Sequence, residues 1–149
     1  MMKIYYAGAL FSLGERLFNK ELSAQLRNLG YMMFLPQENQ AGKISDIFKG
    51  DVAWIKWCDT LLAIVDNADV DSGTCWEIGY AYAMGKRIVL VRTDFRQLEK
   101  WGEEFRPINL MMYECADKVI EYYDNDMKEL VNQINGTLLD TVDNHNTCE

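Results

Sequence analysis

The sequence contains a single histidine, His145, in a polar stretch near the end of the 149 residues. One histidine placed there speaks against a histidine-based catalytic triad and against most zinc sites. Acid–base chemistry must then come from carboxylates, tyrosines or lysines. We therefore expect no metal site of the histidine-rich kind.

The four cysteines form no C-x-x-C pair and lie far apart, at Cys58, Cys75, Cys115 and Cys148. This spacing is typical of free thiols in a reducing compartment. No run of residues is long and apolar enough to span a membrane, and the N-terminus lacks a signal-peptide layout. These absences predict a cytoplasmic protein with no membrane partner.

Positive charge is scarce, since 15 Lys and Arg stand against 23 Asp and Glu for a net charge of −8. A nucleic-acid phosphate backbone is therefore not an expected partner, although a neutral nucleoside or sugar is compatible with this charge. The G-x-G-x-x-G pattern is also missing, so a dinucleotide site is not supported.

Apolar runs and helical spacings alternate along the chain. Strands are predicted over 3–7, 31–35, 59–65, 87–92 and around 119–120, and helices over 12–29, 44–58, 78–84 and 122–134. Such alternation predicts an α/β fold of flavodoxin-like or Rossmann-like type, a doubly wound sandwich with a five-stranded, mainly parallel sheet. We expect one domain over 1–136 and a polar tail over 137–149, with a short helix or mobile loop over 95–105.

The most informative stretch is 66–81, which joins a predicted buried strand to a predicted helix. Ligands of open α/β sheets bind at such turns. Gly73 suits a tight turn or a close approach to a ligand, and Asp71 stands at or just before the helix start. Glu77 would then lie in the first helical turn and face the crevice.

A purely structural interpretation of this stretch is open as well. Thr74-x-x-Glu77 fits a capping box, in which Thr74 caps the helix and Glu77 bonds back to the cap amide. Asp71 could simply favour the helix dipole. Asp66 and Asp69 could join Asp71 in a divalent-metal cluster, but acidic loops are commonly just solvated.

Two other positions are ambiguous when read alone. Asp51 falls within a predicted helix, where a solvated carboxylate is the ordinary interpretation. Gly8 follows the first strand, where a small residue lets backbone amides approach a ligand. Trp54, Trp57 and Trp76 are typical of a core or an interface.

Four separated pieces of the chain, in order, carry a family resemblance. They are Ile4-Tyr5-Tyr6-Ala7-Gly8, then Asp51, then Asp71-x-Gly73-Thr74-x-x-Glu77-Ile78-Gly79-Tyr80-Ala81 with Gly85-Lys86, and last Pro107-Ile108-Asn109-Leu110-Met111. In these pieces and their spacing the chain resembles the nucleoside 2-deoxyribosyltransferase family over roughly residues 3–120. The polar tail after Gly136 has no clear counterpart in the family pattern.

The resemblance implies the transfer of a 2′-deoxyribosyl group between purine or pyrimidine bases, with no cofactor and no metal. Glu77 matches the family's nucleophile, Asp51 the carboxylate that handles the base's proton, and Tyr5 the tyrosine that orients the nucleophile. Asp71 matches the residue that holds the sugar, and Asn109 one that reaches the 5′-hydroxyl from an adjacent subunit.

Further expectations follow from the same resemblance. Gly8, Gly73 and Met111, which sits beside Asn109, are added as substrate-binding candidates. The implied partners are 2′-deoxyribonucleosides, free nucleobases and further copies of the chain, in a homo-oligomer between dimer and hexamer that shares its active sites.

Three other functions compete. A deoxynucleoside 5′-monophosphate N-glycosidase needs phosphate donors, for which Ser12, Arg16 and Lys43 are candidates, although Asp71 would repel phosphate. A phosphoribohydrolase of the cytokinin-activating type carries a Gly-Gly before its turn and a catalytic Arg, where this chain has Asp71-Ser72-Gly73. A non-catalytic nucleotide-binding module is the third.

Overall fold

Five short apolar runs form one parallel sheet in the computed structural model, which describes residues 1–39, 42–96, 99–101 and 104–140. The strands are β1 (Lys3–Ala7), β2 (Met32–Phe34), β3 (Thr60–Ile64), β4 (Arg87–Arg92) and β7 (Lys118–Glu121). Their order is β2-β1-β3-β4-β7 and every neighbouring pair is parallel. The predicted doubly wound fold is confirmed, with the strand order of the flavodoxin-like class.

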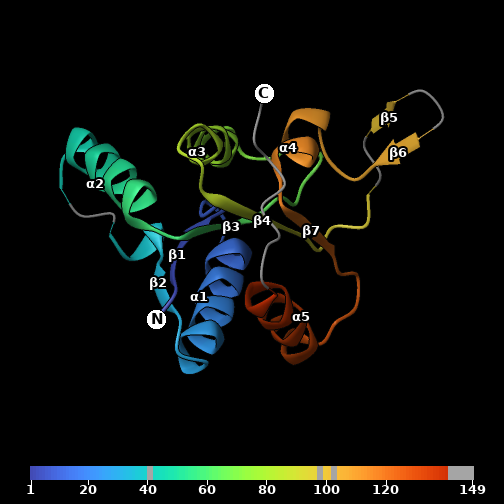
Figure 1. Cartoon of the computed structure of the whole chain (residues 1–149), viewed down its shortest axis with the longest axis horizontal. Coiled ribbons are helices and arrows are strands. Elements are labelled where there is room, and N and C mark those ends of the chain that lie inside the picture. The colour runs from blue at the N-terminus through green and yellow to red at the C-terminus, as the bar shows by residue number, and fades with distance from the viewer. Residues whose placement is uncertain (40–41, 97–98, 102–103, 141–149) are drawn as a thin grey trace.

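Helices cover both faces of this sheet, as Figure 1 shows. The helical segments are α1 (Leu13–Asn28), the short 3-10 helix η1 (Pro36–Glu38), α2 (Ile44–Trp57), α3 (Ser72–Ala83), α4 (Leu110–Cys115) and α5 (Met127–Leu139). α1 and α5 lie on one face, and α2, α3 and α4 lie on the other. Within the described part of the chain, none of these helices has the length and apolar character needed to cross a membrane.

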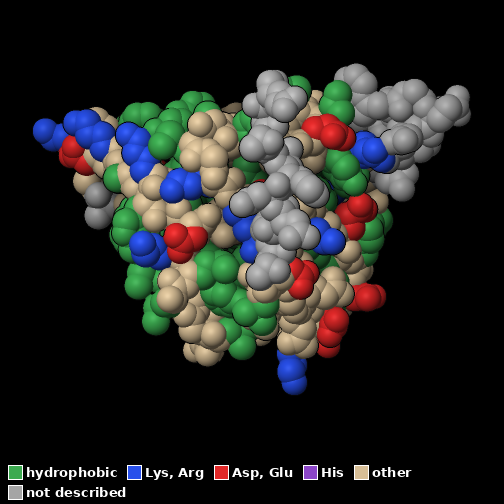
Figure 2. Space-filling view, viewed as in Figure 1, with side chains coloured by type: hydrophobic (Ala, Val, Ile, Leu, Met, Phe, Trp, Pro, Cys, Tyr) green, Lys and Arg blue, Asp and Glu red, His purple; other side chains and the backbone are tan. Residues whose placement is uncertain are grey.

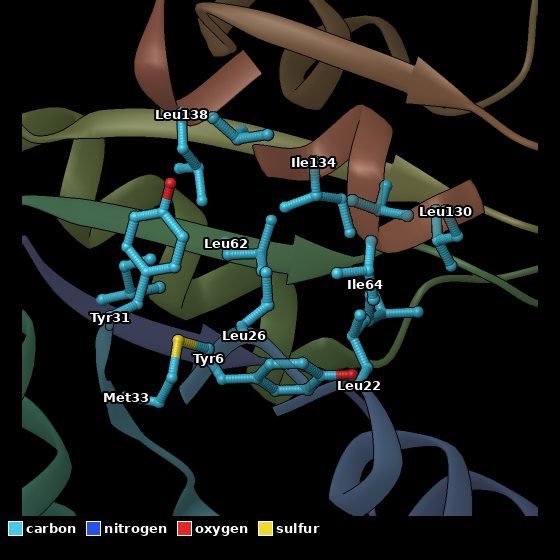
Figure 3. Close-up of a cluster of buried hydrophobic side chains, with 14 of the residues drawn as sticks. Tyr6, Leu22, Leu26, Tyr31, Met33, Leu62, Ile64, Leu130, Ile134 and Leu138 are labelled. Carbon is cyan, nitrogen blue, oxygen red and sulfur yellow. The ribbon is translucent and has the colours of Figure 1, made fainter. Parts of the chain in front are cut away.

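The alternation of side chains along each strand divides the core into two layers. Tyr6 and Ile4 point toward α1 and α5, where they pack with Leu22, Leu26 and Ile134 (Figure 3). Tyr5 and Ala7 point the other way and pack with residues of α2 and α3, including Ile55, Ile78 and Ala81. This parity places Tyr5 beneath the helix that carries Glu77.

Two sequence-based predictions about the second half of the chain are wrong. Instead of a helix or loop, the 95–105 segment contains a two-stranded antiparallel hairpin, β5 (Glu99–Trp101) with β6 (Glu104–Arg106). α5 starts later than predicted and runs through Gly136 to Leu139, because Ile134 and Leu138 are buried on both sides of that glycine. Residues 141–149, with His145, Cys148 and Glu149, lie outside the described residues.

The chain leaves β1 toward β2 on one side, while β3 pairs with β1 on the other side. Such a reversal of winding direction opens a crevice beyond the carboxyl ends of the two central strands. Gly8 follows β1 and Asp66 lies two residues after the end of β3, so the candidate site lies at this reversal.

Candidate active site

α3 begins one turn earlier than the Thr74 capping box predicts. Asp71 is the N-cap, and its Oδ2 accepts hydrogen bonds from Thr74 N at 2.9 Å and Thr74 Oγ1 at 3.1 Å. Thr74 is therefore the third residue of the helix, and Glu77 lies in the second turn rather than the first. A Cβ at Gly73 would stand 3.1 Å from Asp71 Oδ2, so glycine leaves room for this cap.

Because Glu77 takes no part in the N-cap, its side chain can contact a residue that is distant in the sequence. The hydroxyl of Tyr5 donates a hydrogen bond of 2.7 Å to Glu77 Oε1. Tyr5 is 0% exposed, so its ring holds the carboxylate from the sheet side. The other oxygen, Oε2, accepts no hydrogen bond from the residues that the structure describes, which leaves it for a reacting atom.

The pKa of Glu77 is raised to about 7, mainly by burial and also by the charges of Asp51 and Asp71, although the hydrogen bond from Tyr5 lowers it. The helix N-terminus therefore does not keep the carboxyl group of Glu77 at its ordinary pKa. Glu77 is a turn too deep for the N-terminal amides to compensate, because the favourable field falls off within the first turn.

Asp51 lies on α2, half-buried, on the side that faces α3. Burial raises the pKa of its carboxyl group, and its charge raises the pKa of both Tyr5 and Glu77. The pKa of the Tyr5 hydroxyl is held well above its usual value, mainly by burial, so Tyr5 stays a donor. Tyr5, Asp51 and Glu77 thus lie close enough to act on one another, although they come from β1, α2 and α3.

Asn109 and Met111 lie elsewhere on the same molecule. Asn109 is the N-cap of α4 and accepts a hydrogen bond from Met111 N at 2.9 Å. Both residues line a hollow of about 690 Å³ between α3 and α4, together with Cys75 and Tyr82. Cys75 and Tyr82 lie on the flank of α3 that faces α4, whereas Trp76 lies on the flank that contacts α2. The chain therefore does not bring its own Asn109 to Glu77.

Asp71 lines a second, smaller cavity of about 200 Å³ with Ala9, Glu15, Asn19 and Asn67. Gly8 lies beside it at the end of β1, and a Cβ there would contact Ile64 Cβ at 3.4 Å. Asp66 has a structural partner, since its carboxylate accepts bonds from Thr93 N and Asp94 N. The floor of this cavity is therefore held by the loops after β3 and β4.

Arg92 is a residue that the sequence reasoning missed. It is 0% exposed, and its guanidinium donates to the carbonyl oxygens of Val65, Asn67 and Arg96. It thereby ties the loop that leads to Asp71 onto the end of β4. The sequence signal that could have revealed this role is a positively charged residue at the end of a predicted buried strand.

Lys86 caps the C-terminal end of α2 rather than that of the helix that precedes it. Its ammonium group donates to the carbonyl oxygens of Lys56 and Cys58, at the end of α2. The helix before Lys86, α3, ends at Ala83, and Gly85 just beyond its C-cap Met84 adopts a φ of 63°. Lys86 therefore helps to anchor the helix that carries Asp51.

The comparison with protein families finds one model, described as nucleoside 2-deoxyribosyltransferase, that matches residues 4–112. A nucleoside deoxyribosyltransferase from Lactobacillus johnsonii is 38% identical over 74 residues, which are 50% of this chain and 45% of that protein. The chain thus spans less than half the length of this curated relative.

Solved structures extend the similarity to most of the chain. A 2-deoxyribosyltransferase from Bacillus psychrosaccharolyticus is 31% identical with a TM-score of 0.68, over 87% of this chain and 90% of that one. A conserved protein from Enterococcus faecalis V583 is 29% identical with a TM-score of 0.74, over 92% and 99%.

Proposed function

The chain belongs to the nucleoside 2-deoxyribosyltransferase family, and from that membership we propose that it moves a 2′-deoxyribosyl group between purine or pyrimidine bases. The observation that carries the proposal is the hydrogen bond between the buried Tyr5 hydroxyl and Glu77. It fixes one carboxylate oxygen and leaves the other for the anomeric carbon.

The chemistry accounts for the carboxylate. Breaking an N-glycosidic bond develops positive charge on the sugar, and an ionised Glu77 stabilises this charge and bonds to C1′. The electron pair of the broken C1′–N bond leaves with the base. A second base then attacks C1′ from the vacated side and releases Glu77, so the two displacements retain the anomeric configuration.

The departing base needs a proton on the ring nitrogen that was bonded to C1′. Asp51 is the donor in this proposal, because burial raises the pKa of its carboxyl group and makes the protonated form more accessible. Asp51 takes the proton back from the incoming base in the second step. Proton transfer of this kind is typically worth about 100- to 10,000-fold in rate.

The remaining candidates hold the sugar. Asp71 lines the small cavity beside the end of β1, where its second oxygen, Oδ1, accepts no bond from the described residues and can accept one from a 3′-hydroxyl. Gly8 and Gly73 leave space around it. Asn109 and Met111 face away from Glu77 in their own chain, so we assign them to a neighbouring site in a homo-oligomer.

A 5′-monophosphate N-glycosidase is the second candidate, and the contacts of its presumed phosphate donors count against it. Ser12 caps α1 by accepting from Glu15 N, and Arg16 donates to the carbonyl oxygens of Leu10 and Phe11. The small cavity instead carries the acidic groups Glu15, Asp66 and Asp71, which repel a phosphate.

The proposal is tested by incubating the protein with deoxyinosine and free adenine and separating the products by chromatography. We expect deoxyadenosine, and only traces when inosine replaces deoxyinosine, because a 2′-hydroxyl beside Glu77 would be crowded and unpaired. Free deoxyribose without deoxyadenosine would indicate a hydrolase. No product at all from a protein that binds the nucleoside would indicate a binding module.

A further inference from the structure

An aromatic pair, called the aromatic rim below, lies close to Asp51 and Glu77 in the sequence and joins their two helices. Phe48 of α2 and Trp76 of α3 meet with ring centroids 5.7 Å apart and a tilt of 57°. Phe48 lies one turn before Asp51, and Trp76 immediately precedes Glu77. The two rings therefore bridge the two helices within one turn of each carboxylate in the sequence.

This rim is unusually exposed for large aromatic side chains. Phe48 is 56% exposed and Trp76 is 48% exposed. Figure 2 shows hydrophobic side chains along the edge of the molecule that carries α2 and α3. The sequence favoured a core or interface role for Trp76, and its exposure shows that the ring is not buried in the core of one chain.

The two rings are not held equally. Trp76 stacks on Tyr80 of the same helix, with centroids 5.0 Å apart and an interplanar angle of 10°. Phe48 has only the tilted contact with Trp76 among its ring contacts in the described residues. Trp76 is thus a fixed platform, and Phe48 is the partner that can turn aside at little cost.

We propose that Phe48 and Trp76 form the stacking subsite for the substrate's nucleobase, with the base lying flat on Trp76 and replacing part of its contact with Phe48. A planar heteroaromatic ring gains from stacking on an aromatic face whatever its identity. A base held there lies next to Asp51, which handles its proton, and keeps its sugar toward Glu77. The choice of ligand rests on the proposed transferase function.

The test measures the affinity for free adenine by titration calorimetry, with quenching of tryptophan fluorescence as a second readout and without any donor nucleoside. Phe48→Leu and Trp76→Leu are compared with wild type and with Trp57→Leu. Trp57 is a fair control, because it is 39% exposed on the same helix as Phe48 but packs against Trp54 and Lys3. Melting curves check that all variants fold.

Both rim variants should bind adenine about 5- to 150-fold more weakly, the range that base–aromatic stacking spans. The quenching should disappear in Trp76→Leu and persist in Trp57→Leu. With a donor present, the rim variants should raise KM for the base far more than they lower kcat. Such a split is not expected of residues that only support the fold.

Unchanged adenine affinity in both rim variants, or no binding by wild type, would overturn the subsite. A change in sedimentation of Trp76→Leu with unchanged affinity would assign the rim to contacts between chains and overturn it as well. Rim-dependent adenine binding without any sugar transfer would uphold the subsite and refute the transferase. Transfer at the wild-type rate by both variants would refute the subsite and support the transferase.

Discussion

Ionising Glu77 places a negative charge between the buried ring of Tyr5 and the carboxylates of Asp51 and Asp71. The folded protein resists this charge, and the proposed chemistry requires it. The pKa of Glu77 rises from 4.5 to about 7 in the fold, so stability and activity should respond to pH in opposite senses.

The stability of the wild-type protein should fall relative to Glu77→Gln as pH rises. Below about pH 4.5 the side chain is protonated in both the folded and the unfolded chain, so the two proteins differ little. Between pH 4.5 and about 7 only the unfolded chain releases the proton, which destabilises the wild-type fold. Melting temperatures at pH 5 and pH 8 check this, with the Gln variant gaining much more at pH 8 than at pH 5. An equal difference at both pH values would contradict the burial of this charge.

Transfer activity should rise with pH through about 7, as Glu77 ionises. Tyr5→Phe removes the hydrogen bond that lowers the pKa of Glu77, so this rising limb should move to higher pH. The lost bond to a charged group is worth about 1.5–3 kcal/mol, which corresponds to a loss of roughly ten- to hundredfold at pH 7. A pH–rate profile of kcat/KM for both proteins checks it. An unshifted limb in Tyr5→Phe would show that the hydroxyl does not act on Glu77.

Asp71, at the start of α3, has a structural role as the N-cap and a proposed role in binding the sugar. Asp71→Asn keeps an N-cap acceptor, so the free energy of unfolding should change by only a few tenths of a kcal/mol, whereas Asp71→Ala should cost about 1 kcal/mol. Both changes should weaken the hold on the sugar and raise KM for the donor, because both remove the carboxylate. Urea denaturation and donor kinetics measure the two effects separately. Full activity in Asp71→Asn would leave Asp71 with only its capping role.

The same helix start shows where sequence reasoning succeeds and where it stops. The apolar runs of β1 and β4 predicted their bounds correctly, since a fully buried strand has few competing interpretations. Asp71 and Thr74 both obey the rules for an N-cap, and local pattern does not choose between them. The choice is made by a residue 72 positions away from Glu77, because Tyr5 draws that carboxylate out of the cap.

Packing also overrode local signals in two other elements. Gly136 suggested the end of a helix, but the burial of Ile134 and Leu138 outweighs the cost of about 1 kcal/mol for an internal glycine. The charged 95–105 segment shows no clean alternation, so the β5–β6 hairpin left no periodic signal.

At the scale of the whole molecule, the proposed site is incomplete in one chain. Asn109 lines the hollow between α3 and α4, on the flank of α3 away from Asp51 and Tyr5. Its assigned role on the sugar's 5′-hydroxyl therefore requires a second copy. Met111, 76% exposed beside it, is assigned to the same contact in this proposal.

Mixing two inactive variants tests this assignment. Glu77→Gln lacks the nucleophile and Asn109→Ala lacks the neighbour's contribution, but a mixed pair contains one intact site. Co-refolding equal amounts should restore about a quarter of wild-type activity, because half of the randomly formed pairs are mixed and one of their two sites is complete. Mixing wild type with Glu77→Gln is the control for subunit exchange. No recovery, or a fully active Asn109→Ala, would place Asn109 outside the shared site.

The proposed covalent bond between Glu77 and the sugar is tested most directly with a 2′-fluoro-arabino nucleoside. Fluorine destabilises the oxocarbenium-like transition state, so the second displacement slows and the sugar remains attached. Intact mass spectrometry should show one added fluorosugar per chain, and peptide mapping should locate it on Glu77. Glu77→Gln should carry no label and should lose transfer by roughly four to six orders of magnitude while remaining folded. A label on Asp51 or Asp71, or labelling of the Gln variant, would contradict the account.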